Sequence, residues 1–382
     1  MRTTNIAILV SGFYAWAGMA IAQAQTPPDS PAAGQAPAAA PAPKSPLTQW
    51  GTNFSFLFDG YVDGNFNSPA SGFNGLRAFD VRSNTAHVNM GMITIDRAPA
   101  PLGFHLDAGF GQTFELLNNL GNRDPDSWKY FQQAYVSVKP KSWGGAEIDL
   151  GKFATSAGAE VIDVNQNWNY SRSLLFAWAA PSWHFGARVS FPVGPHFTGS
   201  VQVLNGCNNV EPVNSGKTIG ITGAYAWKKV TWSNNYYVGP EHPHTTRGWR
   251  NSYDTFVQVN PSDNLSYYIN FDYLRDKYVG PGAGQVVGLA GAARYAFPKT
   301  KFALAGRLEW LDDVDGFSTG TAQNLAEFTV TGEYKMTSWL ITRVEVRSDF
   351  SSRPFFEKSR PGGSQTQPTV LLGLIAYLAP TK

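Results

Sequence analysis

The chain has 382 residues and a formal net charge of +2, with 15% charged and 14% aromatic residues. A charge this close to zero argues against a polyanionic partner, and no nucleic-acid binding is expected because no basic run carries interleaved aromatic residues. The mean hydropathy of −0.24 excludes a bundle of transmembrane helices, each of which needs about 20 nearly uninterrupted apolar residues. It permits a membrane barrel, in which only every second strand residue faces lipid.

The first residues have the pattern of an export signal. Arg2 precedes an apolar run over residues 6–22, and Ala20 and Ala22 form an A-x-A cleavage signature. This pattern predicts a secretory signal peptide over residues 1–22, with an uncleaved anchor helix as the alternative. Residues 23–48 are rich in Pro and Ala without hydrophobic periodicity, which predicts an extended periplasmic linker before a barrel domain over residues 49–382.

From Trp50 onward, apolar and polar residues alternate with the period of two that is typical of strands. In one such stretch, Leu304 and Leu308 alternate with Arg307 and Glu309. The pattern recurs along the chain and predicts an all-β fold with about 16 strands, within a range of 14–18.

The connectors between these strands alternate between short and long. Residues 98–101, 228–229 and 335–338 are short connectors, whereas 67–82, 152–182 and 351–366 are long ones. Outer-membrane barrels have short periplasmic turns and long outer loops, and a Greek-key sandwich has no reason to alternate in this way. The sequence therefore predicts a transmembrane up-and-down antiparallel β-barrel in the bacterial outer membrane. Because the first connector is long and the strand count is even, both termini are expected in the periplasm.

A barrel of about 16 strands encloses an aqueous channel, so the polar strand faces should line the lumen. Arginines on late strands and acidic residues on early strands would then give a transverse field that sets ion preference. His87 and His105 also lie on polar faces. The candidate pore-lining residues are Asp59, Asp63, Asp107, Asp149, Arg188, Arg307, Glu309, Arg343, Glu345 and Arg347.

Aromatic residues near strand ends are expected to form girdles at the two membrane interfaces. The candidates are Trp50, Tyr130, Trp143, Trp183, Trp227, Trp232, Tyr236, Tyr295, Trp310, Trp339 and Tyr377.

The segment Lys152–Ser182 is too apolar and aromatic for a solvated loop. Because apolar segments avoid water, we expect it to fold into the barrel and to narrow the pore. Residues 157–164 have some helical character. The candidate constriction residues, facing the opposite wall, are Glu160, Asp163, Asn167, Asn169 and Arg172. The alternative is a loop that caps the barrel mouth or packs against a neighbouring protomer.

Several stretches carry a family resemblance. They are Gly151–Phe153, Gly158–Ile162, the run NWNYSRS at Asn167–Ser173, and Phe58–Asp63. With these residues the chain resembles the outer-membrane β-barrel porin family (OmpL-like) from about residue 54 to residue 378. The resemblance implies a porin-like outer-membrane protein and adds no solute. The C-terminus departs from many outer-membrane barrels, which end on an aromatic residue, because four residues follow Leu378.

No catalytic motif appears in the sequence, so no enzymatic activity is expected. The stretch Glu241–His244 could supply a pair of metal ligands, but the spacing places no third ligand, and neither a metal nor a cofactor is expected. Cys207 is expected to be a small loop filler, with a reactive thiol as the alternative.

Three functions fit these observations. The first is an outer-membrane porin whose water-filled channel lets small hydrophilic solutes diffuse passively. The second is a plugged barrel that acts as a structural protein, adhesin or receptor, and the third is a secreted soluble β protein such as a carbohydrate-active enzyme. For the porin, the expected partners are outer-membrane lipid, small hydrophilic solutes and, by analogy, two further copies in a trimer.

Overall fold

The computed structural model describes residues 45–118, 124–277 and 284–380. The predicted signal peptide and residues 23–44 of the predicted linker lie outside the described residues. The described strands form one sheet: β1 (Thr48–Gln49), β2 (Thr52–Asn65), β3 (Ala86–Arg97), β4 (Leu102–Phe110), β5 (Phe131–Val138), β6 (Glu147–Ala154), β7 (Trp183–Pro192), β8 (Phe197–Cys207), β9 (Thr218–Trp227), β10 (Val230–Gly239), β11 (Arg250–Ser262), β12 (Leu265–Asp276), β13 (Gly284–Ala296), β14 (Phe302–Asp313), β15 (Gln323–Lys335), β16 (Leu340–Ser351) and β17 (Thr366–Leu378).

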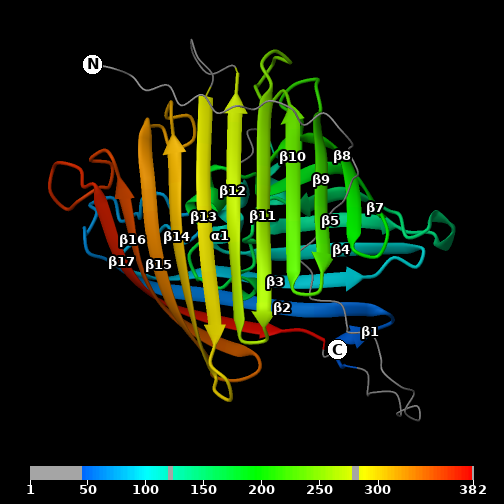
Figure 1. The fold of residues 1–382 in the computed structure, drawn as a ribbon, viewed down its shortest axis with the longest axis horizontal. Coiled ribbons are helices and arrows are strands. Elements are labelled where there is room, and N and C mark those ends of the chain that lie inside the picture. The colour runs from blue at the N-terminus through cyan, green and yellow to red at the C-terminus, as the bar shows by residue number, and fades with distance from the viewer. Residues whose placement is uncertain (1–44, 119–123, 278–283, 381–382) are drawn as a thin grey trace.

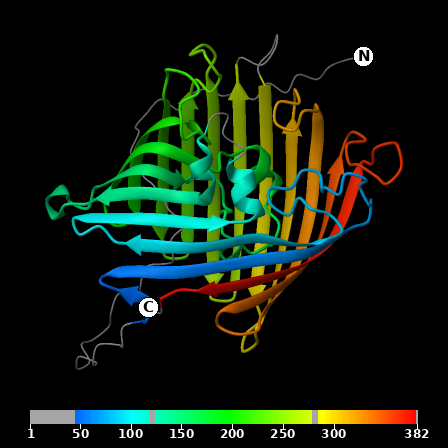
Figure 2. The ribbon, with the colours of Figure 1, turned by 180° about the vertical axis from the view of Figure 1, so that it is seen from behind.

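Strands β2 to β17 close into a barrel. Each pairs antiparallel with its neighbours in sequence, and β17 returns to pair with β2, for example through Leu374 and Gly60. The strands β10–β14 cross the front wall upright, while β2–β5 cross the rear wall at a steep angle to them (Figures 1 and 2). The prediction of a sixteen-stranded up-and-down barrel is confirmed; β1 only adds a two-residue pairing at the start of β2. Closure leaves no open sheet edge between these strands.

The two faces of the barrel wall differ in polarity. On β14 the side chain of Leu308 is 67% exposed on the outside, whereas Arg307 is 1% exposed and faces inward. Neighbouring strands repeat this pattern, with Val330 and Val344 outside and Thr331 and Glu345 inside. The predicted alternation of an apolar exterior and a polar interior is therefore correct.

The connectors alternate in length as predicted. Residues 193–196, 228–229 and 336–339 form short turns, and 66–85, 155–182 and 352–365 form long loops. The helices lie in connectors: α1 (Gln112–Asn118), α2 (Leu174–Trp178) and the 3-10 helices η1 (Asp126–Tyr130), η2 (Lys141–Trp143) and η3 (Val164–Gln166). None of the helices in the described ranges is long and apolar enough to cross a membrane.

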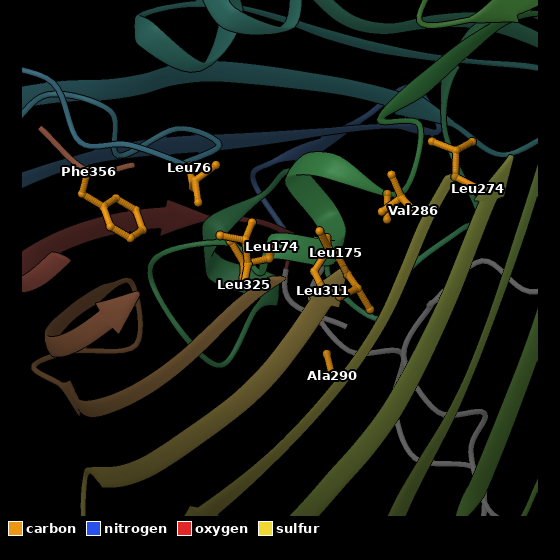
Figure 3. Packing of buried hydrophobic residues seen from close by; sticks show 10 residues of the cluster. Leu76, Leu174, Leu175, Leu274, Val286, Ala290, Leu311, Leu325 and Phe356 are labelled. Atoms are coloured by element: carbon orange, nitrogen blue, oxygen red, sulfur yellow. The ribbon is translucent and has the colours of Figure 1, made fainter. Parts of the chain in front are cut away.

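The long connector 155–182, hereafter the inner loop, packs inside the barrel. Leu174 and Leu175 of α2 pack in one buried cluster with Leu311 of β14 and Leu325 of β15, as Figure 3 shows. Leu76 and Phe356, from the long loops 66–85 and 352–365, belong to the same cluster (Figure 3). The inner loop is thus held between the barrel wall and two other long loops.

The prediction of helical character for residues 157–164 is wrong. Gly158 has a φ of 88°, which interrupts a right-handed helix there. The helix forms later, at α2, where the side chain of Ser173 accepts a hydrogen bond from the backbone N–H of Phe176 at 3.0 Å and so caps its start.

Candidate functional site

Arg343 on β16 fastens the middle of the inner loop to the barrel wall. Its Nη1 donates to the carbonyl oxygens of Val164 at 2.9 Å and Asn169 at 3.1 Å, and its Nη2 donates to that of Asn167 at 2.6 Å. The guanidinium also pairs with Glu333 of the neighbouring β15 at 2.8 Å. The five donors of a guanidinium suit this use, since they can serve a carboxylate and several carbonyls at once.

Arg307 on β14 holds the next stretch of the loop. Its Nη1 donates to the carboxylate of Glu160 at 2.6 Å and to the carbonyl oxygen of Ser171 at 2.8 Å, and its Nε pairs with Glu327 at 2.8 Å. Glu160 in turn accepts a hydrogen bond from the backbone N–H of Ser173 at 2.6 Å. One arginine therefore connects two segments of the loop with the wall.

Arg347 and Glu345 on β16 complete the attachment. Arg347 donates to the carbonyl oxygen of Arg172 at 2.6 Å and pairs with Asp349 at 2.7 Å. Glu345 accepts hydrogen bonds from the backbone N–H groups of Tyr170 at 2.6 Å and Ser171 at 3.0 Å. The wall thus supplies donors to the loop carbonyls and an acceptor for the loop amides.

The late-strand wall is not the basic wall that the sequence predicted. Each of the three predicted arginines has a carboxylate partner, and these partners include Glu327 and Glu333 of β15, which sequence reasoning missed. Both glutamates alternate with outward residues such as Phe328 and Val330, and this alternation could have identified them as inward residues. The positive charge is therefore compensated locally rather than by an acidic wall across the lumen.

The predicted constriction residues have different partners. Asn169 donates to Thr331 of β15 at 2.7 Å, and Asp163 reaches across to β5, where it accepts a hydrogen bond from Gln132 at 2.8 Å. The side chains of Asn167 and Arg172 hydrogen-bond mainly within the inner loop, although Asn167 also lines the cavity described below. The side chain of Asn167 bonds the backbone of Val161 at 2.9 and 2.7 Å, and Arg172 donates to three carbonyl oxygens of its own loop, including that of Val161.

Asp163 lies on the inner loop, outside the membrane-spanning strands. Burial raises the pKa of its carboxyl to about 6, and the nearby negative charge of Asp107 acts in the same direction. The hydrogen bond from Gln132 and the positive charge of Arg172 oppose the shift.

The early-strand candidates form separate groups on the inner wall. Asp149 of β6 pairs with Arg188 of β7 at 2.7 Å. Asp107 of β4 contacts His105 at 3.0 Å. On β2, Asp59 and Asp63 are 0% and 5% exposed, so neither lies at an open water surface. Their contact with a permeating solute stays a prediction.

An open cavity of about 1310 Å³ lies beside the inner loop. Its wall comes from the inner faces of β3 to β12, and the loop contributes Glu160, Gln166 and Trp168. None of the lining residues belongs to β13–β17, against which the loop is fastened. Residues of the short connectors 98–101, 193–196 and 228–229 also line it, so the cavity extends to the short-turn end of the barrel. This cavity therefore lies off-centre in the barrel, away from β13–β17.

Ten of the eleven girdle candidates have exposed side chains, from Tyr377 at 36% to Trp50 at 88%. The prediction for Trp183 is wrong, because this residue is 0% exposed. Its ring packs with Phe79, Leu117 and Phe176, and the ammonium group of Lys152 lies 3.9 Å from the ring centroid. The pairing of β7 with β8 shifts register between His184 and Gly186, so the regular alternation does not extend to this end of the strand.

The residues considered for metal binding have structural partners. Glu241 accepts hydrogen bonds from the backbone N–H of Cys207 at 3.0 Å and from Thr218, and His242 contacts Asp276 at 2.6 Å. Within the three described ranges, no group of three or more His, Cys, Asp or Glu residues is arranged to hold a metal ion. Cys207 is half-buried at the end of β8.

Comparison with known proteins supports the barrel fold. Residues 51–378 match the family described as "Putative beta-barrel porin-2, OmpL-like". The chain belongs to this family. The match spans the whole closed barrel, from β2 to β17, and confirms the resemblance seen in the sequence. The protein is thus an outer-membrane β-barrel of the porin type. None of the curated proteins compared with this porin matches it.

Solved structures show the same fold at low sequence identity. The porin superposes on an anion-selective porin from Comamonas acidovorans with a TM-score of 0.59 and 10% identity, covering 86% of this chain and 99% of that one. For Salmonella typhi OmpF in complex with daunomycin the TM-score is 0.58 and the identity 11%, with 86% and 97% covered. For in-vitro folded OmpT of Vibrio cholerae in its trimer form the values are 0.56 and 10%, with 86% and 99% covered.

Proposed function

We propose that this porin lets small hydrophilic solutes diffuse passively through a water-filled path that runs between the inner loop and the β3–β12 wall. The observation that carries the proposal is the one-sided attachment of the loop. Arg307, Arg343 and Arg347 hold it against the late strands, and the cavity of about 1310 Å³ remains on the other side. No step of this transport requires catalysis or a cofactor.

The plugged barrel is the competing function, because the inner loop buries much of the polar lumen. Single-channel recordings in planar bilayers separate the two. A porin gives discrete conductance steps from purified, heat-modifiable protein, whereas a plugged barrel inserts without conducting. The secreted soluble alternative conflicts with family membership and with an exterior on which residues such as Leu308, Ile269 and Leu372 are more than half exposed.

The orientation follows from connector length. We place the short turns in the periplasm and the long loops outside the cell, which puts both ends of the barrel in the periplasm. A signal peptide over residues 1–22 and a linker over 23–48 fit this placement. Protease added to intact cells should cut long loops such as 352–365 and spare the short turns.

A trimer fits the strand lengths. β4, β5 and β6 have 9, 8 and 8 residues, whereas β11–β17 have 12 or 13. A spanning strand needs about 9–11 residues, so the β4–β6 wall is the part least able to match the bilayer alone. We propose that this wall, with Phe104, Val136 and Leu150 exposed on it, packs against a second copy. Light scattering in detergent measures the number of copies.

A further inference from the structure

The charges that line the cavity are almost all paired. Four carboxylates line it, and each contacts a basic side chain. The pairs are Asp96 with His105 (3.1 Å), which also contacts Asp107 (3.0 Å), Glu147 with Lys139 (2.9 Å), Asp149 with Arg188 (2.7 Å) and Glu160 with Arg307 (2.6 Å). Close opposite charges cancel at a distance, so these walls offer a passing ion little net attraction or repulsion.

The three remaining basic residues of the lining, Arg97, His196 and Lys228, lie at the short-turn end. All three are exposed. Arg97 donates to the carbonyl oxygen of Trp50 at 3.3 Å, and the ring of Trp227 lies 4.4 Å from the ammonium group of Lys228 and 6.4 Å, between ring centroids, from His196. At this exposed rim, salt screens their field. The inner part of the cavity is therefore polar and close to neutral.

Aromatic rings line the cavity on two sides. Trp168 of the inner loop faces Tyr268 of β12, with ring centroids 5.1 Å apart and an interplanar angle of 36°. On another part of the wall, Tyr135 of β5 stacks on His105 of β4, with centroids 5.2 Å apart and an angle of 13°. All four residues line the same cavity. Aromatic rings present flat apolar faces while the tyrosine hydroxyl and the ring N–H groups remain able to hydrogen-bond.

Neutral hydrogen-bonding groups lie among these rings. Gln166 of the inner loop and Gln258 and Asn260 of β11 line the cavity, and none of the three is buried. A side-chain amide offers two donors and one acceptor oxygen without a net charge. A site with flat apolar faces, neutral donors and acceptors, and paired charges suits an uncharged solute that combines a ring with many hydroxyl groups.

We propose that this cavity selects uncharged, ring-shaped, hydroxyl-rich solutes, the chemistry of small sugars, with Trp168 and Tyr268 as the principal contact on the inner loop side. This inference rests on the proposed channel function and adds the solute class. The apolar face of a sugar ring packs on the aromatic rings, and its hydroxyls exchange hydrogen bonds with Gln258 and Asn260. An open-chain polyol has the same hydroxyls but no ring face.

The test compares solutes that differ in one property each. Full-length protein is reconstituted into vesicles, and the influx of labelled glucose and labelled sorbitol is measured at the same low concentration. Sorbitol is the open-chain counterpart of glucose and has nearly the same size. One stacking contact predicts that glucose enters about fivefold faster. Glucosamine and glucuronate, ring-shaped solutes of opposite charge, should enter at rates within about twofold of each other.

Two substitutions test whether Trp168 and Tyr268 cause the preference for glucose over sorbitol. Trp168→Leu and Tyr268→Leu each remove an aromatic face, and both should bring the ratio of glucose to sorbitol influx toward one. Trp249→Leu is the matched control, since Trp249 is 51% exposed and does not line the cavity. It should keep the ratio of the unmodified protein. Two variants at different positions keep the test valid if one of them fails to assemble.

A wrong solute class and a wrong channel function give different results. If the protein conducts ions and both solutes enter at equal rates, or if the ratio survives both substitutions, the solute class is wrong while the channel stands. If heat-modifiable protein in vesicles admits neither solute and gives no conductance steps, the proposed channel function fails and the solute class fails with it.

Discussion

Arg343 on β16 donates through Nη2 to the carbonyl oxygen of Asn167, at 2.6 Å, near the middle of the inner loop. Its side chain is 2% exposed, and Glu333 balances its charge at 2.8 Å. The residue was expected to line the pore, and it does face inward. Its hydrogen bonds go to the loop backbone, which means that it acts on permeation through the position of the loop.

Arg343→Met is predicted to loosen the inner loop rather than to change ion preference. The substitution removes three hydrogen bonds to loop carbonyls and leaves Glu333 with Arg294 alone, at 2.8 Å. Because it breaks a buried ion pair, we expect the free energy of unfolding to fall by about 3 kcal/mol. Bilayer recordings should show larger and noisier conductance steps.

The control for Arg343→Met is Lys358→Gln, which removes a positive charge from an exposed position in the long loop 352–365. This variant should behave like the unmodified protein. Quiet steps of unchanged size in Arg343→Met, together with a shift toward cation selectivity, would mean that Arg343 acts directly on passing ions.

Glu345 should show a graded effect. Glu345→Gln keeps one acceptor oxygen for the amides of Tyr170 and Ser171, whereas Glu345→Leu keeps none and leaves both amides unsatisfied. Each unsatisfied buried group costs about 1–3 kcal/mol. Current noise in single-channel recordings should therefore be largest for Glu345→Leu and intermediate for Glu345→Gln. Equal noise in the two variants would show that these hydrogen bonds do not hold the loop.

Asp163 makes stability depend on pH. Its folded-state pKa of about 6 lies above the ordinary value of 3.8, so the folded protein holds this proton more tightly than the unfolded chain does. The stability that protonation provides is fully present below about pH 4 and is lost as the pH rises through about 6. Asp163→Asn keeps an acceptor for Gln132 and removes the titration.

The measurement for Asp163 is the unfolding midpoint on heating, for the unmodified protein and for Asp163→Asn, across pH 4 to 7. The stability of the unmodified protein relative to the variant should fall over this range. Because other groups titrate in both proteins, the difference between the two curves carries the information. A difference that does not vary with pH would show that Asp163 keeps its ordinary pKa.

The sequence predicted the wall of this barrel better than the contacts made inside it. Alternation placed Leu308 outside and Arg307 inside, because the pleat of a strand fixes the direction of each side chain. The alternation of connector lengths gave the topology. The apolar composition of residues 152–182 indicated the inward loop, since a segment with Leu174, Leu175 and Phe176 has to avoid water.

The partners of the inward residues could not be predicted in the same way. Periodicity shows that Arg307 faces the lumen, but not that the carbonyl oxygen of Ser171, 136 residues away, lies 2.8 Å from it. The same limit explains why the burial of Trp183 was not predicted. Its position at a strand end suggested a membrane interface, and only the register shift and the packing of Leu117 against it show that it is buried.

Cysteine accessibility tests most directly whether the water path runs beside the inner loop, opposite the late strands. The background is Cys207→Ser, which lacks the chain's single native cysteine. In it, Gln258→Cys places a thiol in the cavity, and Thr329→Cys places one on the late-strand wall at a residue that is 1% exposed. A bulky methanethiosulfonate reagent should reduce the conductance of Gln258→Cys and leave Thr329→Cys unchanged. A reduction at Thr329→Cys with none at Gln258→Cys would place the path on the other side of the loop.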